Sequence, residues 1–150
     1  MPLTPDHDPA DTGVHFHADH PSFAFEHIAE RSAWIERCID HHDCELGRIN
    51  IVAVTDETLH AINIEFLNHD TLTDIITFDD VQGNLIGGEL YISWDRVMDN
   101  ALLLDLEDED ELDRVIIHGV LHLLGFKDKS DEDAALMRNK ENEWLALRSA

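Results

Sequence analysis

Apolar and polar residues alternate along the chain in two rhythms, and these rhythms predict its secondary structure. Alternation with a period of two predicts strands, and apolar residues spaced three and four apart predict helices. The predicted strands are 13–19, 47–55, 74–78 and 87–93, and the predicted helices are 25–42, 56–68, 93–106, 107–125 and 130–149. With no internal repeat and no domain break, the pattern indicates a single α+β domain, in which about five helices pack on a small four-stranded mixed sheet.

The helix predicted at 107–125 is unusual because its second half is apolar on nearly every side. Between Val115 and Leu124 only His118, Gly119 and His122 interrupt the apolar residues, so this segment is predicted to be buried. Residues four apart lie on the same helix face, about 5–6 Å from each other, so the two imidazoles converge on one point. Buried polar nitrogens need partners, and one metal ion would satisfy both histidines.

A glycine and an aspartate follow the two histidines. Gly125 suits the left-handed residue that ends a helix, and it lets the chain turn back so that Asp128 reaches the histidines. The resulting H-x3-H-x2-G-x2-D pattern has the spacing of the metzincin proteases, with Gly119 where those enzymes keep glutamate. Three protein ligands with an open fourth position are typical of a catalytic zinc; iron and nickel fit less specifically. The alternative is two core histidines bonded to backbone, with Asp128 capping a turn.

The stretch "HGVLHLLGFKD" at 118–128 resembles the hallmark of the YbeY family of metal-dependent endoribonucleases, roughly H-G-x-L-H-L-x-G-Y-D-H. Two weaker blocks, "INIEFLNHDTLTDIITF" and "GELYIS", support the resemblance by their order and spacing. It implies one zincin-like hydrolase domain over 14–150 that cuts single-stranded precursor rRNA, free or in a ribosomal subunit, and does not act on DNA. It also implies one zinc per chain on His118, His122 and Asp128, the last in place of the family's third histidine.

The resemblance breaks at one position that bears on catalysis. The family usually has an arginine after the aromatic residue of the second helix, and here that position is Leu67. We therefore consider His69, Asp70 and Lys127 as candidate catalytic residues, with a solvated loop residue as the alternative for His69. Two other functions stay open. A zincin-like metalloprotease is favoured by the spacing and disfavoured by Gly119, whereas Leu67 favours a non-catalytic, metal-stabilised ribosome-assembly factor.

The charge of the chain is one-sided, because ten basic residues against 33 acidic ones give a net charge of −23. Such an excess repels itself and is tolerated where salt screens it, so it is typical of a protein from a high-salt cytoplasm. Binding of cations or of a basic partner is the alternative, and the charge alone argues against nucleic acid. Half of the basic residues lie near the C-terminus, where they either face RNA or pair with neighbouring acids: Lys127, Lys129, Arg138, Lys140 and Arg148.

The N-terminus and the cysteines add smaller constraints. Residues 1–13 are polar, acidic and proline-bearing, so we expect them to be disordered, and they lack the features of a signal peptide. No apolar run approaches the roughly 18 residues of a membrane span, so a soluble cytoplasmic protein is expected. Cys38 and Cys44 are expected to be free thiols; a disulfide, or zinc ligation together with His41 and His42, is the alternative.

Overall fold

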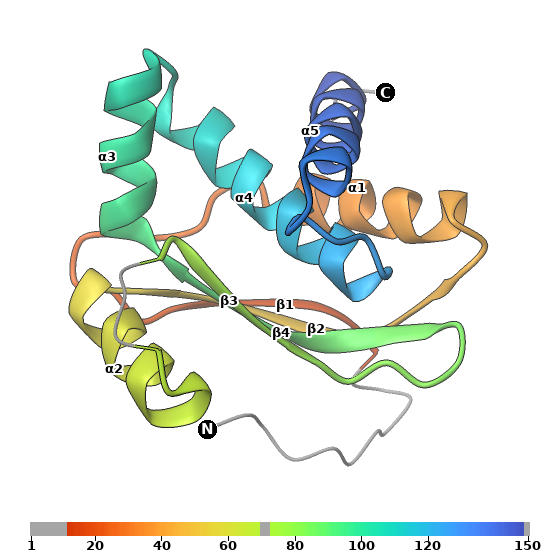
Figure 1. Cartoon of the computed structure of the whole chain (residues 1–150), viewed down its shortest axis with the longest axis horizontal. Helices are drawn as coiled ribbons and strands as arrows, with labels where there is room; N and C mark the ends of the chain where they lie inside the picture. The colour runs from red at the N-terminus through yellow and green to blue at the C-terminus, as the bar shows by residue number, and fades with distance from the viewer. Residues whose placement is uncertain (1–11, 70–72, 149–150) are drawn as a thin grey trace.

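The computed structural model describes residues 12–69 and 73–148, which form one β-sheet with helices on both faces (Figure 1). The strands are β1 (Gly13–Ala18), β2 (Glu45–Val54), β3 (Ile75–Asp79) and β4 (Leu85–Ser93). They lie in the order β1-β2-β4-β3, with β1, β2 and β4 parallel and β3 antiparallel to β4. The segment 1–13, predicted to be disordered, falls outside the described residues except at its end, where β1 starts at residue 13.

In the described residues, five helices cover this sheet: α1 (Ile28–His41), α2 (Asp56–Leu67), α3 (Trp94–Leu104), α4 (Asp108–Leu123) and α5 (Asp131–Ala146). Helix α2 lies on one face, and the other four lie on the opposite side, where α4 crosses the sheet (Figure 1). The predicted α+β class, the mixed four-stranded sheet and the five helices are therefore confirmed. None of these helices is both long and apolar enough to cross a lipid bilayer.

The main core lies between α4 and the central strands. Every apolar side chain of α4 from Val115 to Leu123 is buried, as its lack of a polar face predicts. Gly119 marks the closest approach of helix and sheet, because a Cβ atom there would lie 2.8 Å from Ile75 Cδ1 and 2.9 Å from Leu90 Cδ1. A residue without a side chain at this position lets α4 rest directly on β3 and β4.

Helix α2 is less buried than its apolar pattern predicts. Leu59 packs with Val54 and Ile76 in a second, smaller core. Phe66 and Leu67, which the same pattern places on the buried face, stay 38% and 41% exposed. The reason for Leu67 is that the last turn of α2 borders a cavity, described below, instead of the core.

The two cysteines are free thiols, as expected. Burial raises the pKa of the Cys38 thiol to about 12, so this sulfur is protonated and a poor metal ligand. His42 bonds through Nδ1 to the Cys38 carbonyl oxygen at 2.7 Å. The alternative of a zinc site at Cys38 and Cys44 is therefore not supported.

We expect the stability of the fold to rise with salt, because screening weakens the self-repulsion of a chain with net charge −23. Between about 0.1 M and about 1 M potassium chloride, the Debye length falls from about 10 Å to about 3 Å. We expect a gain of about 2 kcal/mol, seen as a rise of about 4–8 °C in Tm by circular dichroism.

A triple variant provides the control for this salt dependence. Glu36, Asp40 and Glu65 are exposed acids on the surfaces of α1 and α2. The variant Glu36→Gln/Asp40→Asn/Glu65→Gln carries less repulsion, so its Tm should rise less with salt. A wild-type Tm that is flat or falls with salt would contradict the expectation and indicate that bound cations already neutralise the surface.

Candidate metal centre

The second half of α4 aims both histidines of the motif at one point. The Nε2 atoms of His118 and His122 lie 3.1 Å apart, with the two rings nearly perpendicular at 78°. Their side chains are 20% and 29% exposed, so the nitrogens can be reached from solvent. The convergence that the spacing of four residues predicts is therefore present.

The turn after α4 brings the aspartate to the same point. Gly125 has a φ of +104°, which favours glycine, and its N–H donates to the carbonyl of His122. The N–H of Phe126 donates to the carbonyl of Leu121, which completes a Schellman motif and reverses the chain. Asp128 Oδ2 then lies 3.3 Å from Nε2 of His118 and 3.3 Å from Nε2 of His122.

These three atoms have the geometry that a small divalent ion needs. A tetrahedral zinc with bonds of about 2.0–2.1 Å separates its ligand atoms by about 3.3–3.4 Å. The triangle formed by His118, His122 and Asp128 has sides of 3.1, 3.3 and 3.3 Å. In the part of the chain that the structure describes, no other group of three such residues is close enough to share an ion. The residues present therefore fit a three-ligand metal site with one open position.

A buried carboxylate behind the site orients the first histidine. Glu141 of α5 has a side chain only 2% exposed, and its Oε2 lies 2.6 Å from Nδ1 of His118. An ionised carboxylate can only accept, so the proton of His118 is held on Nδ1 and the lone pair of Nε2 is free for a metal. Carboxylates in this position also make the imidazole a stronger ligand.

Glu141 is itself held by a buried arginine. Arg114 Nη1 lies 3.2 Å from Glu141 Oε1, and the same guanidinium makes a bidentate pair with the fully buried Glu111. Burial by itself would raise the pKa of the Glu141 carboxyl, but His118 and Arg114 outweigh it and hold this pKa below its ordinary value. The carboxylate is therefore charged when it meets the histidine.

The sequence pattern does not single out Glu141, which is one of several acids near the C-terminal basic residues. A signal was present, because the buried positions of α5 are Met137, Glu141 and Trp144. These are spaced by four and three residues, so Glu141 occupies a core position of the helix. A carboxylate at a core position needs a buried partner, and this requirement points to a histidine or an arginine nearby.

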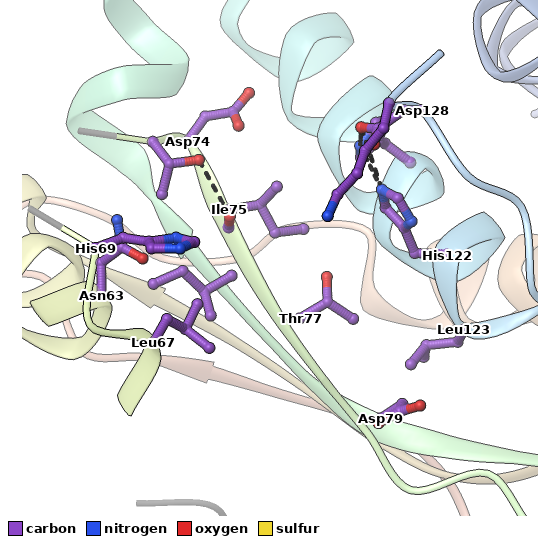
Figure 2. Close-up of a pocket in the computed structure, with 14 residues that line it drawn as sticks. Asn63, Leu67, His69, Asp74, Ile75, Thr77, Asp79, His122, Leu123 and Asp128 are labelled. Carbon is purple, nitrogen blue, oxygen red and sulfur yellow. Dashed lines mark hydrogen bonds and ion pairs between the residues drawn. The ribbon is translucent and has the colours of Figure 1, made fainter. Parts of the chain in front are cut away.

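The three ligand atoms open onto a cavity of about 700 Å³ between α2, β3 and α4 (Figure 2). It is lined by Asn63, Leu67, His69, Thr73, Asp74, Ile75, Ile76, Thr77, Asp79, His118, His122, Leu123, Asp128 and Lys129. Figure 2 shows His69 and Leu67 on one side of β3 and His122 with Asp128 on the other. The metal centre thus lies at one end of a space that extends along the edge of the sheet.

The candidate catalytic residues have different positions relative to this cavity. His69 lines it, as does Leu67 at the position where an arginine was expected. Lys127 is exposed and is not part of the lining. Asp70 lies outside the described residues. Asp74, which the sequence analysis includes only as part of a family block, also lines the cavity. Burial raises the pKa of its carboxyl, although Arg114 and His118 act to lower it.

The basic residues near the C-terminus are mostly engaged with acids. The ion pairs are Arg138 with Glu141, Lys140 with Glu143, and Arg148 with Asp110 and Asp113. Of the other two, Lys129 lines the cavity and Lys127 does not. Arg138 and Lys140 thus pair with acids of their own helix, as the pairing alternative has it, whereas Arg148 pairs with acids of α4. The cavity itself has little positive charge.

Comparison with known proteins identifies the family. A family model described as "Endoribonuclease YbeY" matches residues 17–148. The chain is 47% identical to Endoribonuclease YbeY of Flavobacterium johnsoniae over 83% of its own length and 90% of that protein. It is 39% identical to Endoribonuclease YbeY of Cytophaga hutchinsonii over 90% of its length and 95% of that protein.

A solved structure agrees at the level of the fold. The solution structure of a Thermotoga maritima protein superposes with a TM-score of 0.65, covering 90% of this chain and 88% of the other. The two sequences are 22% identical, so this likeness concerns the architecture alone. Because the family model spans most of the chain and the relatives match nearly end to end, this chain belongs to the YbeY endoribonuclease family.

Proposed function

We propose that this chain is a zinc-dependent endoribonuclease that cuts single-stranded RNA during rRNA processing and ribosome maturation. One zinc ion per chain would be held by His118, His122 and Asp128. The observation that carries the proposal is the triangle of ligand atoms, whose open side meets a cavity of about 700 Å³. A cavity of this size is within the usual range for ligand sites of about 300–1,000 Å³. The name that the relatives share supports RNA as the substrate.

The groups of the chain around this centre suit hydrolysis of a phosphodiester. A zinc ion there would polarise a phosphoryl oxygen and lower the pKa of a water to about 7. Glu141 holds the proton of His118 on Nδ1, so the tautomer suited to the metal is set before substrate arrives. Asp74 has a raised pKa and lines the cavity, so it is a candidate for proton exchange with the substrate. His69 lines the same cavity and is the second candidate.

The metalloprotease alternative is disfavoured by the packing of α4. Zincin proteases place their general base, a glutamate, directly after the first histidine. That position is Gly119, where even a Cβ atom would come within 2.9 Å of Ile75 and Leu90. A side chain there would require the side-chain ends of Ile75 and Leu90 to move. The chain therefore lacks the protease base, and its position is packed closely against Ile75 and Leu90.

A non-catalytic ribosome-assembly factor is the second candidate function, and Leu67 favours it. This side chain is 41% exposed and lines the cavity where the family usually has an arginine. A leucine cannot neutralise the charge that develops on a phosphate during cleavage. In this alternative the metal stabilises the fold, and RNA or a ribosomal subunit binds without being cut.

A nuclease assay with matched variants separates these functions. We expect the zinc-loaded protein to cut a fluorescent single-stranded RNA, to lose this activity in EDTA and to recover it when zinc is returned. His118→Ala should reduce the rate by at least about 100-fold, because a metal-activated step loses several kcal/mol of transition-state stabilisation. His17→Ala is the control, since this exposed histidine lies on β1, at the other edge of the sheet.

Three outcomes would contradict the nuclease. RNA binding without any cleavage by the zinc-loaded wild type would favour the assembly factor. Hydrolysis of casein by pure protein would favour the protease. Cleavage that persists in EDTA and in His118→Ala would mean that the activity belongs to a contaminant.

The proposed partners are precursor rRNA or a ribosomal subunit, and the proposed location is the cytoplasm. With a net charge of −23, the chain is poorly suited to bind nucleic acid through phosphate contacts alone. Contacts to phosphates also weaken steeply as salt rises. A salt-adapted nuclease would therefore draw more of its affinity from the bases of the RNA than from the backbone.

A further inference from the structure

The inner wall of the cavity is the free edge of a strand. Strand β3 pairs with β4 only, and it is the last strand in the order of the sheet that the structure describes. The N–H of Asp80 donates to the backbone carbonyl of Gly87, and the N–H of Ser93 donates to the backbone carbonyl of Asp74. In an antiparallel pair, the residues that exchange such bonds alternate along the strand. Even-numbered residues of β3 therefore bond to β4.

The odd-numbered residues of β3 direct their backbone groups to the other side. Ile75, Thr77 and Asp79 thus present N–H and C=O groups at the free edge, and all three line the cavity. The carbonyl of Ile75 already accepts from the Thr73 hydroxyl at 3.3 Å. Thr77, in the middle of the strand, therefore offers one backbone donor and one backbone acceptor side by side.

The position of Thr77 relates this edge to the metal centre. Figure 2 shows Thr77 between Leu67 and His69 on one side and His122 on the other. A group bound along β3 would therefore lie between the end of α2 and the metal ligands. Ile75, Leu67 and Leu123 add apolar surface to the same cavity, against which a flat ring can pack.

We infer that the free edge of β3 holds an unpaired nucleobase of the RNA, whose Watson–Crick edge bonds to the N–H and C=O of Thr77. The inference rests on the proposed function and gives a physical reason why the nuclease would prefer single-stranded RNA. A base in a duplex uses its Watson–Crick edge for its own pair, so only an unpaired base can bond to the strand.

The charge of the cavity favours a base over a phosphate at this edge. Apart from the proposed metal ligand Asp128, its lining carries the carboxyl groups of Asp74 and Asp79, against one lysine, Lys129. A phosphate beside β3 would face these acids, whereas a neutral base with both donors and acceptors would not be repelled. A polypeptide can also pair with a strand edge, but the missing protease base at Gly119 gives it no reaction here.

A proline at position 77 tests the inference, because the one backbone N–H that it removes faces the cavity. The bonds to β4 come from even-numbered residues and stay intact, and edge strands tolerate proline where the N–H is free. Thr77→Ala removes the same hydroxyl and keeps the N–H, so the comparison of the two variants isolates the backbone group. Equal zinc content and equal Tm of the two variants show that the fold and the metal centre are retained.

The measurement is fluorescence anisotropy of zinc-loaded protein with a short single-stranded 2′-O-methyl RNA of mixed sequence, which resists cleavage. We expect Thr77→Pro to bind at least about tenfold more weakly than Thr77→Ala, because it loses a hydrogen bond and gains a clash. Equal affinity of the two variants would overturn the inference. So would an extended peptide that displaces this RNA from the wild type, because the edge would then be a polypeptide site.

A second measurement uses the wild-type protein alone and does not depend on how the proline variant folds. A strand of guanines and uracils only is synthesised with a methyl group on N1 of every guanine and N3 of every uracil, a modification that leaves the bases neutral. We expect it to bind at least about tenfold more weakly than the unmethylated strand, and equal binding would overturn the inference. If both binding differences are present but ordinary RNA is not cleaved, the proposed nuclease activity is contradicted and the base-binding site is retained.

Discussion

Replacement of His118 or His122 by alanine is expected to remove zinc from the purified protein. Each histidine supplies one corner of a triangle of ligand atoms that lie only 3.1–3.3 Å apart. A site with two remaining ligands binds zinc far more weakly. Elemental analysis of protein purified without added metal should give about one zinc per chain for the wild type and close to none for either variant. Unchanged metal content in both variants would place the metal elsewhere.

The third ligand is tested by two substitutions at one position. Asp128 has a side chain 37% exposed, between Lys127 and Lys129, so a surface ion pair is the competing interpretation. If it binds zinc, Asp128→Ala should lower the affinity by at least about 100-fold, whereas Asp128→His should keep a three-ligand set. Competition with a chromogenic chelator measures both. Equal affinity of wild type and Asp128→Ala would remove Asp128 from the site.

The metal helix could be predicted because its information is local. In a helix, a run of apolar residues interrupted only by His118 and His122 buries the apolar side chains and places the two histidines on one face. The role of Gly125 also follows from one residue, because glycine adopts a positive φ without strain. The same holds for the strands, whose period-two pattern is read over a few residues.

The surroundings of the metal helix could not be predicted in the same way. The cavity combines the end of α2, the edge of β3 and α4, which are distant in the sequence and meet only in the tertiary structure. For this reason the helical pattern placed Leu67 on a buried face, although it borders the cavity. The edge position of β3 depends on the strand order, which local periodicity does not contain.

Substitution of Glu141 is expected to affect stability and metal binding together. Glu141→Ala leaves the buried guanidinium of Arg114 without one of its two carboxylates, and breaking a buried ion pair costs about 3–5 kcal/mol. It also removes the partner of His118 Nδ1, and loss of such a partner weakens metal affinity about 10–100-fold. Thermal unfolding of the metal-free protein and chelator competition measure the two effects separately.

The same helix supplies a matched control for this prediction. Glu143 is 45% exposed and pairs with Lys140 at 3.5 Å, so Glu143→Ala should change stability by less than about 1 kcal/mol and leave zinc affinity unaltered. Glu141→Gln keeps an oxygen that can accept from His118 but removes the charge. It should therefore lose stability and retain more zinc affinity than Glu141→Ala. If Glu141→Ala behaved like Glu143→Ala, then Glu141 would neither support the core nor orient the metal ligand.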